Sequence, residues 1–332
     1  MADSKGVMVY AEASQDKLSS LTTELLGIGR KLADELAEPL CAVLCGSGIN
    51  KLAQQAIAYG ADRVYLVDDP LLKDYQTDSH LAAMEKAAKE AAPAIILLGQ
   101  TAAGRDLAPR LAFRLKAAVA TDCVELNIDA ASKRLHMTRP VYGGNALATF
   151  TTDCDPQLAT VRAKAFPAAA PDDSRQGEVI TVAAGLQADA VRTRLLKKVV
   201  AEVEGVRLED AAIVISGGRG IGSAEGFKQL EELASLFKGA VGASRPPCDN
   251  GWVPEVLQVG ITGKIIAPDL YIAVALSGSS QHLSGCSGAK NIIAINKDAE
   301  ANIFKAANYG IVGDWKKVIP AFTEKVKELL AE

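Results

Sequence analysis

The chain has 332 residues, and at about 150 residues per domain this length favours two domains. Its 36 Lys and Arg residues and 40 Asp and Glu residues give a net charge of −4, without the basic stripe that a nucleic-acid-binding protein needs. No apolar run approaches the roughly 18 residues that cross a bilayer, and residues 1–6 lack the basic-then-apolar pattern of a signal peptide. We therefore expect a cytoplasmic protein with no nucleic-acid partner and no membrane span.

The first half of the chain alternates short apolar runs with helical patterns. Strands are predicted over Gly6–Ala11, Leu40–Cys45, Arg63–Val67 and Ala94–Gly99, and helices over Leu18–Leu36, Leu52–Tyr59 and Thr77–Ala91. The run at 95–98 is continuously apolar rather than alternating, which indicates a strand that is covered on both faces. Strands and helices that alternate at this spacing predict a parallel sheet with helices on both sides.

Between about residues 119 and 182 the apolar pattern changes to a period of two. The runs Leu135–Pro140, Leu147–Thr152 and Leu158–Arg162 are separated by turn residues at 143–145 and 153–156. We interpret these runs as antiparallel strands that close the first domain.

Two segments separate this half from a second α/β series. Residues 166–177 are rich in Pro, Ala, Asp and Ser, and residues 187–207 are polar, so we place the domain boundary at 190, giving domains 1–190 and 191–332. Strands are then predicted at Ala211–Ser216, Gly239–Ala243, Leu270–Leu276 and Asn291–Ile295, and helices at Ala224–Phe237 and Lys316–Leu330. This domain is a doubly wound α/β sheet, and ligands of such sheets bind at the carboxyl ends of the strands.

The six cysteines do not form a metal site by sequence. They include no C-x-x-C pair and no histidine at metal-ligand spacing, so neither a zinc nor an iron–sulfur site is expected. Cys41 and Cys45 lie four residues apart in a predicted strand, which places them on one face as small buried apolar side chains.

A glycine-rich segment at 217–223 follows the first strand of the second domain. Its backbone amides can hold an anion, and Arg219 among the glycines can pair with a phosphate or stack on a ring. No window matches G-x-G-x-x-G, and Ser223 stands where a P-loop needs lysine. The structural alternative is a tight turn between strand and helix.

Two further loops place polar groups near predicted strand ends. Pro246 disfavours helical backbone at Arg245, so we expect this arginine on a stiff, extended loop, where its charge would stabilise the reduced form of a redox-active ring. Thr262, in the loop 258–264, can both donate and accept a hydrogen bond, which suits a ring nitrogen whose protonation changes on reduction. The structural alternative for each loop is a solvated turn.

The segment 276–283 runs from an apolar strand into hydroxyl residues and His282. As a binding loop, its amides would hold a phosphate or carbonyl oxygen, and His282 would donate to the same group. As a purely structural feature, its serines would cap a short helix. No G-x-S-x-G elbow occurs here, so hydrolase chemistry is not expected. Amide and carboxylate groups at 296–298 and 309–315 follow two more strands, where they suit ribose hydroxyls.

Together and in this order, these segments closely resemble the alpha subunit of the electron transfer flavoproteins, the FixB family. The resemblance is carried by residues 258–264, 267–273, 277–283, 294–298 and 309–314, and in the first half by Gly104–Leu111. It covers essentially the whole chain. It implies one FAD bound non-covalently by the C-terminal domain, and an N-terminal domain that pairs with a separate beta subunit.

The resemblance also implies which residues contact FAD. Arg245 would lie over the isoalloxazine ring, Thr262 near its N5 and His282 near its C2 carbonyl. The implied contacts are Arg219, Ser244, Arg245, Val259, Gly260, Ile261, Thr262, Ser277, Gly278, Ser279, Ser280, Gln281, His282, Asn296, Asp314 and Trp315. Ile261 stands where the family usually has Gln, and Ser279–Ser280 where a small and an apolar residue are common. We therefore expect a FAD site with an altered reduction potential.

The function that the resemblance implies is that of an electron carrier subunit rather than a stand-alone enzyme. It would shuttle electrons between a dehydrogenase of the acyl-CoA type and another redox partner. The beta subunit would hold AMP or a second FAD, and with a second FAD the pair would bifurcate electrons between NADH and ferredoxin. Two alternatives stay open: an NAD-dependent dehydrogenase, disfavoured by the missing G-x-G-x-x-G, and a non-catalytic adenine-nucleotide-binding α/β protein.

Overall fold

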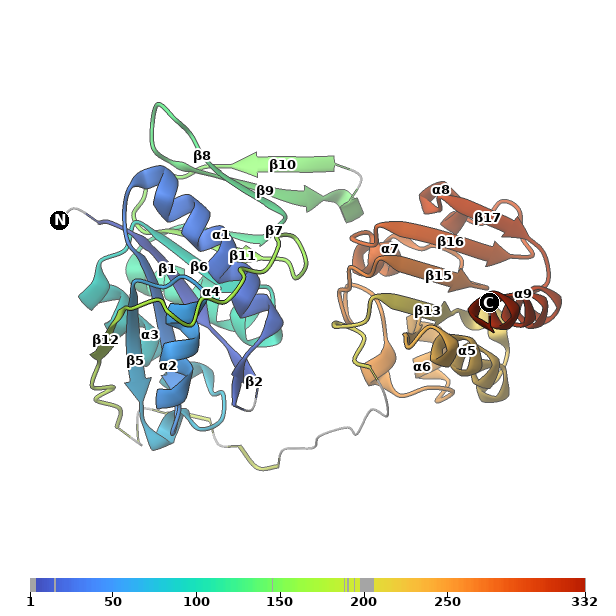
Figure 1. Ribbon diagram of the computed structural model, residues 1–332, viewed down its shortest axis with the longest axis horizontal. Coiled ribbons are helices and arrows are strands. Elements are labelled where there is room, and N and C mark those ends of the chain that lie inside the picture. The colour runs from blue at the N-terminus through green and yellow to red at the C-terminus, as the bar shows by residue number, and fades with distance from the viewer. Residues whose placement is uncertain are drawn as a thin grey trace. The chain divides into compact units, whose positions relative to one another are not determined.

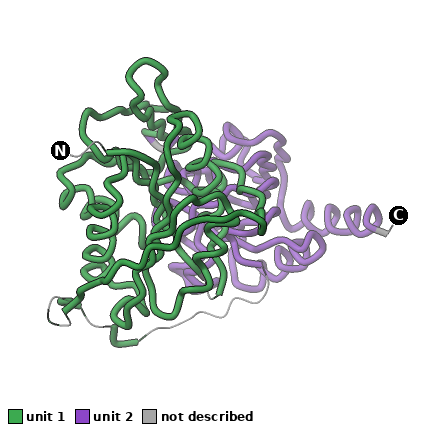
Figure 2. Tube along the Cα trace, turned by 60° about the vertical axis from the view of Figure 1, so that its left-hand side comes forward, with its two compact units in different colours: residues 1–141, 146–198 green, residues 142–145, 199–332 purple. Residues whose placement is uncertain are grey.

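The chain folds into two compact units (Figure 2). The computed structural model describes residues 4–14, 16–144, 146–187, 189, 191–193, 195–197 and 206–331. The N-terminal unit comprises residues 1–141 and 146–198, and the C-terminal unit comprises residues 142–145 and 199–332. The expected boundary at residue 190 and residues 198–205 of the expected polar connection lie outside the described residues.

A seven-stranded parallel sheet forms the centre of the N-terminal unit (Figure 1). In sheet order its strands are β12 (Glu178–Thr181), β5 (Arg63–Asp68), β4 (Leu40–Gly46), β1 (Val7–Ala11), β6 (Ile95–Gly99), β11 (Gln157–Val161) and β7 (Val119–Cys123). Helices α1 (Ser20–Leu36) and α2 (Asn50–Ala58) cover one face, and α3 (Thr77–Ala91) and α4 (Ala102–Leu115) cover the other. The predicted parallel sheet with helices on both faces is confirmed.

Both faces of this sheet are apolar, as the continuous runs predicted. Cys41 and Cys45 pack on the same face, against α3 and α4, as expected from their spacing. Burial raises the pKa of the Cys41 thiol to about 11 and that of Cys45 to about 12, so both are protonated thiols that act as small apolar side chains.

The antiparallel extension is smaller than the period-two pattern predicted. It consists of β8 (Glu125–Ile128), β9 (Leu135–Val141) and β10 (Ala146–Phe150). A separate antiparallel pair is formed by the two-residue strands β2 (Ala13–Ser14) and β3 (Lys17–Leu18). The antiparallel assignment of Leu158–Arg162 is wrong, because β11 inserts between β6 and β7 with parallel pairing to both. Helix α4 was not predicted, since Gly104 and Pro109 interrupt its helical pattern.

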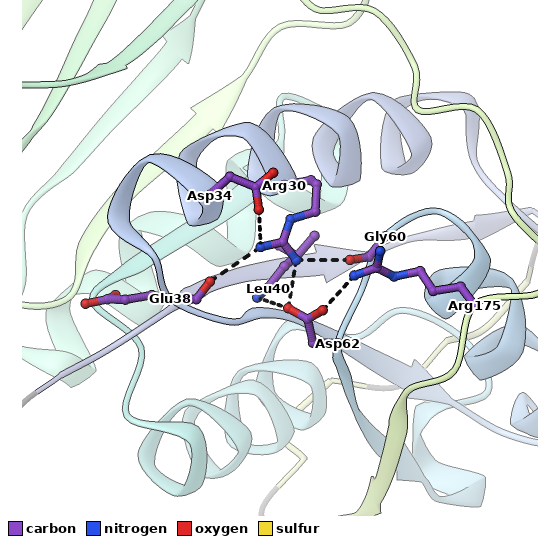
Figure 3. Close-up of polar contacts among 7 residues, drawn as sticks. All are labelled: Arg30, Asp34, Glu38, Leu40, Gly60, Asp62 and Arg175. Carbon is purple, nitrogen blue, oxygen red and sulfur yellow. Dashed lines mark hydrogen bonds and ion pairs between the residues drawn. The ribbon is translucent and has the colours of Figure 1, made fainter.

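A polar network fastens α1 to the start of β5 and to the segment before β12 (Figure 3). Arg30 donates to Asp62 at 2.7 Å, and Arg175 donates to the other oxygen of the same carboxylate at 2.6 Å. The amide of Leu40 also donates to Asp62, at 2.8 Å. Burial alone would raise the pKa of Asp62, but the hydrogen bonds from Leu40 and Arg30 lower it. The ionised Asp62 is therefore the shared acceptor of the network.

Replacing Asp62 with Asn is expected to lower the free energy of unfolding of the N-terminal unit by about 1–3 kcal/mol at pH 7, because Arg30 and Arg175 lose the carboxylate charge that they share. The folded pKa of Asp62 lies below its ordinary 3.8. This stabilisation is therefore present above pH 3.8 and is lost as the pH falls through the folded value. Calorimetry on the full chain at pH 7 and at pH 3 measures both effects.

Asp34→Asn is the matched control for this prediction. Asp34 also pairs with Arg30, at 2.8 Å, but its side chain is 66% exposed and pairs with no second arginine among the described residues. We expect it to cost less than about 1 kcal/mol. Equal destabilisation by the two variants would contradict the central role of Asp62.

The C-terminal unit is built on a five-stranded parallel sheet (Figure 1). In sheet order its strands are β14 (Ala240–Ala243), β13 (Ile213–Gly217), β15 (Leu270–Val274), β16 (Asn291–Asn296) and β17 (Tyr309–Val312). Helices α5 (Ala224–Leu236) and α9 (Trp315–Ala331) pack on one face, α7 (Ser280–Cys286) and α8 (Ile303–Ala306) on the other, and the short α6 (Arg245–Asp249) follows β14. This unit is the expected doubly wound sheet.

The order of strands reverses between β13 and β15. The chain leaves β13 for β14 on one side and then crosses to β15 on the other side of β13. The two connections diverge at the carboxyl ends of β13 and β15, which is where open α/β sheets form a ligand crevice.

Candidate functional site

A cavity of about 690 Å³ lies at this switch point, within the size range of small-molecule sites. The loops that follow β13, β14, β15 and β16 line it, together with the segment 258–262. The predicted contacts found in its wall are Arg219, Ser244, Arg245, Val259, Gly260, Ile261, Thr262, Ser277, Gly278, Ser279, Gln281, His282 and Asn296. Ser280, Asp314 and Trp315 are the predicted contacts that the structure does not bring into this wall.

The glycine-rich loop after β13 touches the loop after β15. A side chain at Gly218 would overlap the carbonyl of Ala275, and one at Gly220 would lie 2.9 Å from the Ala275 Cβ. Trp315 is buried in the core and donates from Nε1 to the carbonyl of Gly220 at 3.0 Å. Trp315 therefore supports this loop from the core, while Arg219 lines the cavity.

Arg245 is the first residue of helix α6, so the predicted extended loop at this position is wrong. Ser244 is the extended N-cap residue, and the two prolines that follow Arg245 fall in the first helical turn, where no backbone donor is required. Arg245 lines the cavity, and its guanidinium pairs with Asp249 one turn later, with Nε 3.2 Å from Oδ2. Its positive charge is therefore partly balanced by Asp249.

Hydrogen bonds hold the segment 258–264 at several positions. The Val259 amide donates to the carbonyl of Ala243 at 2.8 Å, at the end of β14, and the Ile261 amide donates to that of Gln281 at 2.9 Å, in α7. Gln258, which is buried, donates from Nε2 to the hydroxyl of Thr262 at 2.9 Å. These bonds hold Thr262 at a defined place in the cavity wall.

The loop between β15 and α7 needs a glycine. Gly278 has φ +76°, and a Cβ there would overlap the backbone of Ile303. Within the described residues, the amides of Ser277, Gly278 and Ser279 donate to no acceptor. Consecutive free amides of this kind form a concave donor set for an anion.

His282 is engaged by protein atoms on both ring nitrogens. Its Nδ1 lies 3.0 Å from the carbonyl of Val259, so Nδ1 carries the proton and donates, and Nε2 accepts from the hydroxyl of Tyr271 at 2.7 Å. Burial lowers the pKa of His282 to about 4. The expected donation from this ring to a ligand is therefore corrected: His282 is a neutral side chain that joins β15, α7 and the 258–264 segment.

The loop after β16 contributes amide and carboxylate groups. Asn296 donates to the carbonyl of Leu276 at 2.7 Å and accepts from the amide of Asp298 at 3.0 Å, so it joins two loops of the cavity. Asp298, whose carboxylate the sequence suggested for ribose hydroxyls, also lines the wall, and so does Glu300, which the sequence analysis did not name. Glu300 follows the same strand by four residues, and its acidic side chain close to a strand end was the available signal.

The two remaining predicted contacts, Asp314 and Ser280, lie at the starts of helices. The Asp314 carboxylate accepts from the amide of Lys316 at 3.0 Å at the start of α9, and Ser280 begins α7, where its backbone carbonyl accepts from the hydroxyl of Ser284 at 2.8 Å. Both are helix-start residues in the described structure.

Both halves of the chain match models of one known protein family. A model described as "Electron transfer flavoprotein domain" matches residues 7–186, and one described as "Electron transfer flavoprotein FAD-binding domain" matches residues 207–287. The chain belongs to the electron transfer flavoprotein alpha-subunit family. Membership implies a beta subunit as partner and a role in electron transfer, and the second match indicates that the C-terminal domain binds FAD.

Relatives in this family are similar along their whole length. The alpha subunit of Thermoanaerobacterium thermosaccharolyticum is 46% identical over 330 residues, which is 99% of this chain and 100% of that protein. The alpha subunit of Megasphaera elsdenii is 43% identical, over 99% of this chain and 98% of that protein. That of Bacillus subtilis is 40% identical, over 98% of each chain. Among the described residues, no helix is both long enough and apolar enough to cross a membrane.

The chemistry of the cavity wall fits FAD. Arg219 and the free amides of the 277–279 loop can hold a diphosphate, and the carboxylates of Asp298 and Glu300 can accept from sugar hydroxyls. The glycine at 278 lets this loop pack directly against the backbone of Ile303, which a Cβ would prevent. Apolar atoms of the wall and the Thr262 hydroxyl suit a heteroaromatic ring.

Proposed function

We propose that this chain is the FAD-binding alpha subunit of a heterodimer that carries electrons from a dehydrogenase of the acyl-CoA type to a second redox partner in the cytoplasm. The observation that carries the proposal is the convergence of four strand-end loops and the 258–262 segment on one cavity at the switch point. FAD, when bound, supplies one- and two-electron redox chemistry that no side chain of the cavity offers.

Positively and negatively charged residues of the cavity wall would bind different parts of FAD. Arg219 and Arg245 stand at the ends of β13 and β14, and Asp298 and Glu300 follow β16. We infer that the arginines face the phosphate and ring portions of FAD, and that the carboxylates face its ribose. The Thr262 hydroxyl would reach the ring nitrogen N5, and His282 would hold the 258–262 segment in place rather than bind FAD itself.

The exposed positions of the wall would tune the flavin. Ile261 is 50% exposed at the cavity, where the family usually has Gln, so one polar contact to the ring would be replaced by an apolar one. We expect the reduction potential to differ from that of relatives with Gln, while FAD binding is retained.

One measurement tests the function and the nature of the second cofactor. The chain is purified with its beta subunit, and the visible spectrum and the FAD and AMP released per heterodimer are determined. One FAD with one AMP supports a simple carrier. Two FAD support bifurcation of electrons between NADH and ferredoxin. A colourless complex without flavin contradicts the proposal and favours the non-catalytic adenine-nucleotide-binding alternative.

Replacing Arg245 with Ala is expected to lower the reduction potential of the bound flavin by roughly 20–50 mV, because a cation near the ring stabilises its reduced form. The effect is modest because Asp249 balances part of the charge and the Arg245 side chain is 66% exposed. A redox titration of the heterodimer measures it.

Asp249→Asn is the control for Arg245. It removes the partner carboxylate and leaves the guanidinium in place, so the potential should move in the opposite direction. An unchanged potential in both variants would contradict the position of Arg245 over the ring.

A further inference from the structure

Gln258 lines the cavity, although it was not among the FAD contacts that the resemblance implied. Its side chain is 9% exposed, and its backbone is held on both sides, with its amide donating to the carbonyl of Glu255 at 2.9 Å and its carbonyl accepting from the amide of Lys264 at 2.7 Å. A side chain at Gly263 would overlap the Gln258 carbonyl, so the segment is closely folded on itself. Gln258 is therefore a fixed residue and not a solvated loop side chain.

The hydrogen bond from Gln258 determines what the Thr262 hydroxyl can do. A hydroxyl has one proton, and an oxygen that accepts from an amide Nε2 at 2.9 Å keeps that proton for another acceptor. Within the described residues, the Thr262 hydroxyl donates to no side chain or carbonyl. Its proton is therefore available to a ligand in the cavity.

We propose that Gln258 is a positioning residue that makes the Thr262 hydroxyl a hydrogen-bond donor into the cavity. This inference rests on the proposed FAD site. A donor at this place stabilises a ring nitrogen that has a free lone pair, and disfavours the form in which that nitrogen is protonated. Gln258 thereby selects the protonation state of the flavin N5 through the Thr262 hydroxyl.

The opposite orientation of the Gln258 side-chain amide would reverse the role of the Thr262 hydroxyl. If the amide presented its oxygen to Thr262, the hydroxyl would donate to Gln258 and could only accept from the ligand. Gln258→Glu imposes that orientation, because an ionised carboxylate has no proton to donate and takes that of Thr262. Thr262→Val removes the hydroxyl with little change in shape.

The test is a double-mutant cycle on the heterodimer, read by redox titration of the bound flavin and by its visible spectrum. Gln258→Glu and Thr262→Val should shift the potential in the same direction, and the double variant should shift it no further than Gln258→Glu alone. Gln258→Met, which neither donates nor accepts strongly, should shift it less. Thr262→Ser, which keeps the hydroxyl, should have the wild-type potential.

Gln281→Glu is the matched control, since it adds the same charge to the wall of the same cavity without a hydrogen bond to Thr262. Its shift should add to that of Thr262→Val. Additive shifts for Gln258→Glu and Thr262→Val in a complex that holds FAD would overturn the role of Gln258 and leave the proposed function intact. A wild-type complex without FAD would overturn both. If Gln258→Glu does not fold, an unshifted potential in Gln258→Met would overturn the role equally.

Discussion

Gly278→Ala is expected to lower the affinity for FAD by at least tenfold. Gly278 has φ +76°, a conformation that costs an ordinary residue about 1–3 kcal/mol, and the added Cβ would overlap the amide nitrogen of Ile303. The loop can accommodate the methyl group only by moving away from Ile303, and this displaces the free amides of 277–279. A loss of 1.4 kcal/mol already corresponds to a factor of ten in affinity.

Gly251→Ala separates backbone strain from displacement of the loop. Gly251 has φ +68°, close to that of Gly278, but a Cβ there meets nothing within 4 Å and the residue does not line the cavity. Titration of flavin-free heterodimer with FAD gives the two dissociation constants. We expect wild-type affinity for Gly251→Ala, and equal affinities in the two variants would show that the 277–279 loop does not contact FAD.

The regular parts of the fold followed from local patterns. Ile95–Gly99 was recognisable as a buried parallel strand because its apolar run has no polar interruption. Strand β11 was misjudged because its Gln157 and Thr160 are polar yet buried: Gln157 accepts from the amide of Leu135 at 2.8 Å, and Thr160 donates to Gln100. Their partners lie 22 and 60 residues away, so no local pattern could reveal that these polar side chains are satisfied inside the unit.

In the candidate site, the sequence indicated the loops but not the contacts of single residues within them. The loops were recognisable because glycines, hydroxyls and charges follow apolar strands. The roles of Trp315 and His282 depended on contacts made by folding: Trp315 donates to Gly220, and His282 is paired with Tyr271 and Val259. The segment 258–264 was singled out, but nothing marked Gln258 within it, since the role proposed for Gln258 lies in one hydrogen bond to a residue four positions later.

The stability of the C-terminal unit is expected to fall by about 3 kcal/mol between pH 7 and pH 4, through His282. Burial lowers the pKa of this histidine from 6.5 to about 4 in the folded chain. Below pH 6.5 the unfolded chain therefore binds a proton that the folded chain does not, and the stability present above pH 6.5 is lost as the pH falls toward 4. Each pH unit between the two values corresponds to about 1.4 kcal/mol.

Tryptophan fluorescence isolates this effect, because both tryptophans of the chain, Trp252 and Trp315, lie in the C-terminal unit. Urea unfolding of the full chain is followed by this signal at several pH values, for the wild type and for His282→Asn. The variant leaves the Tyr271 hydroxyl and the Val259 carbonyl with poorer partners, so it should be less stable at pH 7 but should lose less stability toward pH 4. A variant as pH-dependent as the wild type would assign the titration to other groups. A flat wild-type profile would contradict the neutral, doubly hydrogen-bonded ring on which the position of the 258–264 segment depends.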